Sequence, residues 1–206
     1  CFFYNNSIPH LLFFLVERAT GEEIASFIQK RIADPLGIEI TAQYDENHMY
    51  DPVTTVLTAN GLLKFGLWIL QKGKWNGNQL LDRALLEAAC SQQTWTGNVE
   101  PGYGNGKGYC MQMWKNAFGG CRMDGGGGQI ALILPEYEMT AVLMGNEARA
   151  DMAIRMFYED ILSRLRAKPL PADEEGKRLL KAAVRDMSRA PYHASAHSRT
   201  EEDING

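Results

Sequence analysis

The stretch RMDGGGGQIALILPEYEMTAVLM, residues 122–144, decides the fold class of this chain. A run of four glycines leads into an apolar segment at 130–134, and a second apolar segment follows at 139–144. Between them lies the turn-forming sequence Pro135-Glu136-Tyr137-Glu138. Two short apolar runs joined by such a turn are typical of a β-hairpin. We therefore predict antiparallel strands in this part of the chain.

The chain on both sides of this hairpin has the patterns of helices. Ser7-Ile8-Pro9 predicts a helix start, with Ser7 as the capping hydroxyl and a proline in the first turn. Thr20-Gly21 predicts the end of this helix. Apolar spacing and stop signals predict further helices over 22–33, 58–72, 82–91 and 148–165, and a strand over 109–114. Thr58 is the predicted cap of its helix, and the Gly, Thr, Asn and Pro content of 94–107 predicts an exposed loop. Helices, then antiparallel strands, then a helix packed against the sheet indicate an α+β fold.

One predicted helix has an unusual surface. Residues 11–16 are apolar on every face, so a helix here needs to be buried on all sides. If nothing covers it, the chain would expose apolar surface and tend to associate.

The length of 206 residues predicts one domain with a tail. We place the domain at 1–168, a linker with a short helix at 169–187, and a disordered tail at 188–206, where little can be buried. The chain starts without a methionine, so we expect its natural N-terminus to lie elsewhere. The choice between bacterial cytoplasm and cell envelope therefore stays open.

Composition excludes several classes of partner. A net charge of −4 without a basic cluster argues against nucleic acid, and the longest apolar run is too short to span a bilayer. The four cysteines lack metal-site spacing, and we expect reduced thiols, with only Cys110 and Cys121 near each other on adjacent strands. His193 and His197 fit a solvated tail better than a metal site. No metal or organic cofactor is implied.

Two short motifs are candidates for chemistry. The first is Tyr4-Asn5-Asn6, just before the first helix, and the second is Asp124 with the glycines that follow it. Taken alone, each is better explained without a function: the first as a packed tyrosine with a turn asparagine, and the second as a flexible turn. A phosphate-binding loop is a poor alternative, because such loops lead into helix N-termini and this one leads into a strand.

The order of several segments changes that interpretation. Phe3-Tyr4-Asn5-Asn6-Ser7, Asp34-Pro35-Leu36-Gly37, Lys72-Gly73-Lys74-Trp75-Asn76-Gly77 and Arg122-Met123-Asp124-Gly125 follow one another along the chain. In this order they resemble serine hydrolases of the class C β-lactamase, penicillin-binding-protein and esterase type. The resemblance covers roughly residues 2–165 and implies part of a β-lactamase/transpeptidase-like fold.

The resemblance also implies a mechanism. These hydrolases attack a β-lactam, a peptidoglycan peptide or an ester with a serine and pass through an acyl-enzyme. By this likeness Tyr4 would transfer protons and Asn6 would orient the substrate. Asp124, Gly125 and Gly126 would line the substrate strand, with a backbone N–H near Gly126 as oxyanion donor. Met123-Asp124-Gly125 stands where Lys/His-Thr/Ser-Gly is expected, so a cation that would bind a β-lactam carboxylate is lost.

The nucleophile motif Ser-x-x-Lys does not occur in the 206 residues. We therefore expect this to be the C-terminal part of such a hydrolase, inactive alone, with the missing N-terminal segment of the same domain as its partner. The expected substrate is a small molecule or a peptidoglycan-type peptide. One alternative is a catalytically inactive binding or regulatory relative. Another is an unrelated structural α+β domain, in which Tyr4 and Asp124-Gly125 would lie far apart.

Overall fold

The computed structural model describes residues 2–41, 44, 55–97, 108–145, 150–166, 168 and 171–189. The chain divides into two compact units, Cys1–Arg164 and Leu165–Gly206. Most of the expected loop at 94–107 and of the expected tail at 188–206 lies outside the described residues.

The first unit begins with helix α1 (Ser7–Thr20). The side chain of Asn5, and not the hydroxyl of Ser7 as expected, caps this helix, because Asn5 Oδ1 accepts the backbone N–H of Ser7 at 2.6 Å. The helix ends where Gly21 adopts a left-handed backbone with φ of 69°, which glycine reaches at little cost. The start and the end of this predicted helix are thus confirmed.

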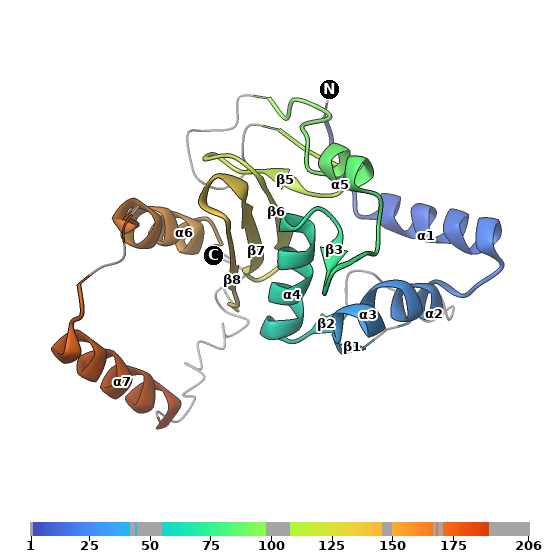
Figure 1. The fold of residues 1–206 in the computed structure, drawn as a ribbon. Coiled ribbons are helices and arrows are strands. Elements are labelled where there is room, and N and C mark those ends of the chain that lie inside the picture. Colours follow the sequence, from blue (N-terminus) through green and yellow to red (C-terminus); the bar gives the residue numbers. More distant parts are fainter. Residues whose placement is uncertain are drawn as a thin grey trace, which may run out of the picture. The chain divides into compact units, whose positions relative to one another are not determined.

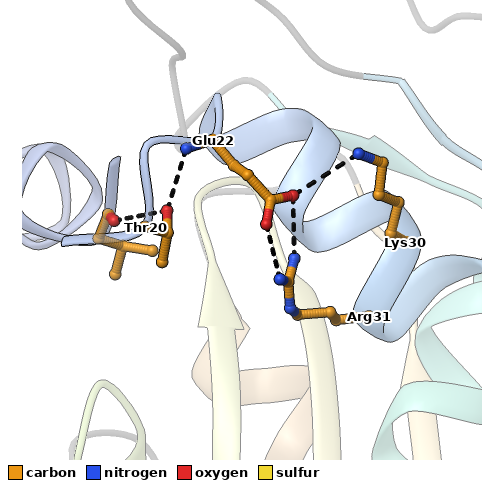
Figure 2. A network of polar contacts seen from close by, with 5 residues as sticks. Thr20, Glu22, Lys30 and Arg31 are labelled. Atoms are coloured by element: carbon orange, nitrogen blue, oxygen red, sulfur yellow. Dashed lines mark hydrogen bonds and ion pairs between the residues drawn. The ribbon is translucent and has the colours of Figure 1, made fainter. Parts of the chain in front are cut away.

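The second helical segment is continuous but changes its winding. It consists of α2 (Ile24–Ile28), a π-helical turn η1 (Gln29–Ala33) and α3 (Asp34–Leu36). Glu17 Oε1 accepts the backbone N–H of Ile24 at 2.9 Å and so caps α2 from α1. Glu22, between the two helices, binds Arg31 through both carboxylate oxygens and also pairs with Lys30 (Figure 2).

Helix α4 (Ala59–Leu70) confirms the prediction of a helix capped by Thr58, whose hydroxyl oxygen accepts the backbone N–H of Gly61 at 3.0 Å. A hairpin of β3 (Lys74–Trp75) and β4 (Asn78–Gln79) follows, and then α5 (Arg83–Ala89), capped by Asp82. Strands β1 (Ile40–Thr41) and β2 (Val56–Leu57) pair with each other before α4.

The main sheet has four antiparallel strands in the order β5-β6-β7-β8. Their bounds are β5 Trp114–Lys115, β6 Cys121–Gly125, β7 Gln129–Leu134 and β8 Met139–Leu143. The predicted hairpin is confirmed, since β7 and β8 pair around the turn Pro135–Tyr137. The predicted strand over 109–114 is wrong for most of its length. Cys110 and Met113 close a tight turn in which Gln112 has a φ of 58°, so the strand begins only at Trp114.

The two faces of this sheet are covered by different helices. Residues of β6 and β7 that face one way, such as Cys121 and Ile133, pack in a core cluster with Trp68 and Ile69 of α4. The alternating residues Ile130, Leu132 and Leu134 pack against the opposite layer. That layer is formed by α6 (Ala150–Met156), the π-helical turn η3 (Phe157–Ile161) and the 3-10 turn η4 (Leu162–Arg164). The sheet thus lies between α4 and α6 (Figure 1), and the predicted α+β fold is confirmed.

Helix α1 differs from what the sequence predicts. None of its residues is buried, although burial on all sides was expected. Its large apolar side chains are about half exposed, namely Ile8, Leu11, Leu12, Phe14 and Leu15. The physical reason is that α1 projects away from the sheet and meets mainly α2 within the described chain (Figure 1).

The second unit contains helix α7 (Glu174–Arg189). Its first turns carry ion pairs between Glu174 and Lys177 and between Glu175 and Arg178. The predicted helix at the end of the linker is therefore present and extends to Arg189.

Candidate functional site

The four glycines form the tip of the β6–β7 hairpin. Gly125 pairs with Gln129, and the backbone N–H of Gly128 donates to Gly125 O at 3.3 Å, so the turn between them is closed. Gly127 and Gly128 have φ angles of 82° and 89°, a left-handed conformation that side chains with a Cβ rarely adopt. Gly126 has open space where a Cβ would lie. The tip therefore presents an uncovered backbone.

The residues after β8 hold this tip in place. The backbone N–H of Gly145 donates to Gly128 O at 3.1 Å, and Gln129 Nε2 donates to Gly145 O at 2.9 Å. A Cβ at Gly145 would lie 3.3 Å from Gly127 O, so the two backbones approach closely. The glycine run is thus an anchored turn, in contrast to a free flexible loop.

A cleft of about 720 Å³ opens at this hairpin tip. The hairpin supplies one wall, and the chain before α4, the start of α4 and the turn at Gln112 supply others. The lining residues are Thr55, Val56, Leu57, Leu62, Gln112, Met123, Asp124, Gly125, Gly126, Gln129 and Met144. Within the described residues this lining carries one acidic side chain and no basic one.

The carboxylate of Asp124 has a buried partner. Arg122 is fully buried, and its Nε donates to Asp124 Oδ2 at 3.1 Å. Both residues face the α6 layer, since they pair in register with Leu132 and Ile130. On this layer burial raises the pKa of Tyr158 to about 12, while the nearby charge of Arg122 acts in the opposite direction. Asp124 therefore lines the cleft with its carboxylate already paired to Arg122 of the same strand.

Tyr4 belongs to an aromatic cluster beside the sheet. Its ring stacks on Trp114 with a centroid distance of 5.6 Å and an interplanar angle of 23°, and it meets Tyr109 edge-on at 6.1 Å. Phe2 contacts the same two rings. Burial, followed by the neighbouring Tyr4, raises the pKa of Tyr109 to about 12, so Tyr109 stays protonated at neutral pH.

The predicted site residues fall into two groups. Asp124, Gly125 and Gly126 all line the cleft. Tyr4 and Asn6 are exposed and do not belong to the described lining. Tyr4 nevertheless stacks on Trp114 of β5, and Trp114 pairs with Arg122 of β6, two residues before Asp124.

Two residues of this region escaped the sequence analysis. Gln112 lines the cleft in a left-handed conformation that strains a residue with a side chain. The apolar residues around Gln112 made this segment resemble a strand, so nothing in the sequence indicated a turn at Gln112. Trp114 stacks against Tyr4, but the sequence predicted it only as a strand residue and gave it no role in the site.

In the described part of the chain, no group of three or more His, Cys, Asp or Glu side chains is arranged to hold a metal ion. None of the helices in that part is both long enough and apolar enough to cross a membrane.

Comparisons with known proteins agree with this architecture. The family model described as Beta-lactamase matches residues 1–162. A Bacillus anthracis protein provisionally assigned as a 6-aminohexanoate-dimer hydrolase has 26% identity and a TM-score of 0.64, over 80% of this chain and 45% of its own. The comparison with curated proteins gives no match.

Two more solved structures share the fold. A protein from Bacteroides dorei DSM 17855, provisionally assigned as a β-lactamase, has 17% identity and a TM-score of 0.61, over 79% of this chain and 59% of its own. A penicillin-binding-protein homologue from Caulobacter crescentus has 13% identity and a TM-score of 0.51, over 66% of this chain and 50% of its own. The chain thus spans about half the length of the solved structures that it resembles.

Proposed function

Because this chain belongs to the β-lactamase family, we propose that it forms part of a serine hydrolase that acts through an acyl-enzyme on an amide or ester. The observation that carries the proposal is the cleft at the tip of the β6–β7 hairpin, where backbone lies open beside polar side chains. A cleft of this kind suits a small substrate whose carbonyl must approach a hydrogen-bond donor closely.

Gly126 has the properties of an oxyanion donor. No side chain covers it, and the hydrogen bonds of Gly128 and Gly145 fix the turn around it. A backbone N–H held in advance can stabilise the negative charge of a tetrahedral intermediate without reorganising during the reaction. Gly125 leaves room for the same approach.

Tyr4 would move the proton between the nucleophile and the leaving group, and Asn6 would orient the substrate. The stack on Trp114 fixes the plane of the Tyr4 ring, while nearly half of the residue stays exposed to receive a partner. The nucleophile would come from a Ser-x-x-Lys segment outside these residues. Its lysine would supply the cationic charge that a tyrosine needs to act as a base near neutral pH.

The charges of the cleft favour one substrate class. A β-lactam carries a carboxylate, but the described lining offers it no basic side chain, because Met123 takes the place of the expected Lys or His and the carboxylate of Asp124 is already paired with Arg122. The name of the Bacillus anthracis relative refers to hydrolysis of a 6-aminohexanoate dimer, which contains an amide bond. We therefore place linear amides and neutral esters ahead of β-lactams as substrates.

The test is active-site labelling of the full-length protein with a fluorophosphonate and with a fluorescent penicillin. Tyr4→Phe should lower labelling by roughly a hundredfold or more, as expected for the loss of a general base. Tyr137→Phe is the matched control, because Tyr137 lies in the turn at the other end of β7. Faster labelling by the fluorophosphonate would support the proposed substrate class, and faster labelling by penicillin would contradict it.

The same experiment distinguishes the hydrolase from the alternative of an inactive binding or regulatory relative. If neither probe labels the folded full-length protein, the inactive binding or regulatory relative becomes the better description. If labelling is strong but equal in wild type and Tyr4→Phe, the hydrolase stands and the role of Tyr4 is wrong.

A further inference from the structure

Helix α7 carries its apolar and its basic side chains on different faces. It comprises 16 residues and belongs to the second compact unit of the chain (Figure 1). Leu179, Leu180, Ala183 and Val184 follow the spacing i, i+1, i+4 and i+5, which places them on one face of an α-helix. These four residues form an apolar stripe.

The apolar stripe is open to water. Leu180 is 65% exposed, Leu179 is 55% exposed and Val184 is 54% exposed. Transfer of apolar surface from water into an apolar environment is favourable, so covering the stripe would stabilise whatever assembly covers it.

The basic side chains lie on the other side of α7. Lys177, Lys181 and Arg185 follow one another at intervals of four residues, and Arg178, seven residues before Arg185, shares this side. All four are exposed. The helix Glu174–Arg189 contains five basic and three acidic residues, which gives it a net charge of +2 in a chain whose total is −4. Positive charge is therefore concentrated on α7, against the trend of the chain.

The acidic residues of the first turn do not cancel this basic face. Glu174 pairs with Lys177 at 2.7 Å, and Glu175 pairs with Arg178 at 2.5 Å. Exposed ion pairs of this kind contribute little, so their cations can exchange partners with an approaching anion. Lys181 lies one turn further along the helix than Lys177, beyond both acids.

The size and the charge of these faces favour a lipid surface over a protein partner. A stable protein interface buries about 800 Å² on each partner, and four aliphatic side chains, one of them an alanine, offer much less. A lipid surface requires less area. A helix with an apolar face, a polar face rich in Lys and Arg and a low overall hydrophobicity lies flat among the headgroups, and anionic lipids attract each of its cations.

We propose that α7 is a peripheral membrane-binding helix for bilayers that contain anionic phospholipids. The apolar stripe enters the boundary between headgroups and acyl chains, and Lys177, Lys181 and Arg185 lie among the anionic headgroups. The helix rests on the bilayer and does not cross it, which agrees with its length and polarity. This inference goes beyond the proposed hydrolase function and is independent of it.

Flotation of the whole chain with lipid vesicles in a density gradient tests the proposal, because aggregated protein does not float. The vesicles contain phosphatidylcholine alone or phosphatidylcholine with phosphatidylserine. We expect the apparent affinity for the vesicles with phosphatidylserine to be higher by about tenfold or more. Added salt should reduce this difference, because it screens exposed charges.

Two double variants test which helix binds. Leu179→Gln with Leu180→Gln should lower the apparent affinity for phosphatidylserine vesicles by about tenfold or more, because it removes most of the apolar stripe. Leu11→Gln with Leu15→Gln is the matched control. It makes the same change at exposed residues of α1, a helix with a single Lys or Arg, and should leave flotation unchanged.

A third double variant tests the basic face separately. Lys181→Gln with Arg185→Gln should lower the apparent affinity for phosphatidylserine vesicles by about tenfold and leave the affinity for phosphatidylcholine vesicles unchanged. Circular dichroism shows whether each variant keeps its helices. Wild-type chain that does not float with phosphatidylserine vesicles would overturn the proposal and leave α7 as a helix for a protein groove. Flotation that the α7 variants do not weaken, or that the α1 variant abolishes, would overturn it as well.

Discussion

Helices α1 and α4 are both rich in large apolar side chains, yet within the described chain only α4 has buried residues. Helix α4 lies on β7 and β8 and buries Trp68 and Ile69, whereas no residue of α1 is buried. Burial contributes about 25 cal/mol for each Å² of apolar surface removed from water, so each apolar side chain of α4 that is buried gains more of this free energy than the half-exposed side chains of α1. The comparison shows that the apolar sequence of a helix predicts that something packs against it, but does not identify which element does so.

The largest difference between the helices should appear in large-to-small substitutions. Trp68→Ala should lower the free energy of unfolding by about 3–5 kcal/mol, because it leaves a cavity under α4. Phe14→Ala should cost at most about 1.5 kcal/mol, because Phe14 is 46% exposed. Urea unfolding followed by circular dichroism measures both. If the two substitutions lower the free energy of unfolding equally, the apolar side chains of α1 are buried in solution, which would contradict the difference between the helices.

A smaller effect should follow from the close contact between α4 and β8. A Cβ on Gly66 would lie only 2.5 Å from Cγ2 of Thr140, so Gly66→Ala should destabilise the fold by about 1–3 kcal/mol. Adding Thr140→Ser removes that methyl group and should restore most of the loss. Gly126→Ala, which meets no atom within 4 Å, should change stability by less than about 0.5 kcal/mol. Failure of the double variant to recover would show that the clash is not the cause.

Sequence reasoning identified the elements better than the contacts between them. The β7–β8 hairpin, the Thr58 cap and the end of α1 at Gly21 follow from local chemistry, and the structure confirms them. The turn at Gln112 was not predictable, because its left-handed backbone belongs to a turn that the hydrogen bond from the Cys110 N–H to Met113 O closes, and it opposes the local propensity.

The candidate site shows the same division. Asp124, Gly125 and Gly126 were selected by their order in the chain, and all three line the cleft. The stack of Tyr4 on Trp114 depends on a contact across more than a hundred residues, and the complete burial of Arg122 beside Asp124 depends on the layer that covers this face of the sheet. Such contacts are properties of the packed fold, which residue patterns do not encode locally.

The exposed face of α1 makes a prediction about association. Leu11→Gln combined with Leu15→Gln should change the stability of the monomer by no more than about 0.5 kcal/mol per site, because both side chains are already about half exposed. The same change should reduce self-association in sedimentation velocity and lower the binding of a hydrophobic dye. Ile69→Gln, a matched change on α4, should instead unfold the chain. A wild-type chain that is monomeric and binds little dye would contradict the expectation.

The smallest expected effect concerns the ionic contact that follows α1. The hydrogen bonds from Arg31 hold the pKa of Glu22 below its ordinary value of 4.5 (Figure 2). A carboxyl whose pKa is lowered by folding stabilises the folded state above its unfolded pKa, and it loses this contribution as the pH falls through the folded value. Glu22→Gln should therefore flatten the acid side of the stability curve below pH 4.5 and leave the neutral side nearly unchanged, because exposed pairs contribute little. Thermal melts of wild type, Glu22→Gln, Arg31→Gln and the double variant over this pH range measure the contribution of the pair to stability.

The same melts test whether α1 and α4 unfold together. No residue of α1 is buried, so loss of the pair should loosen α1 while the α4 core keeps its melting transition. If α1 and the α4 core lose their structure in the same transition, the two helices unfold as one unit.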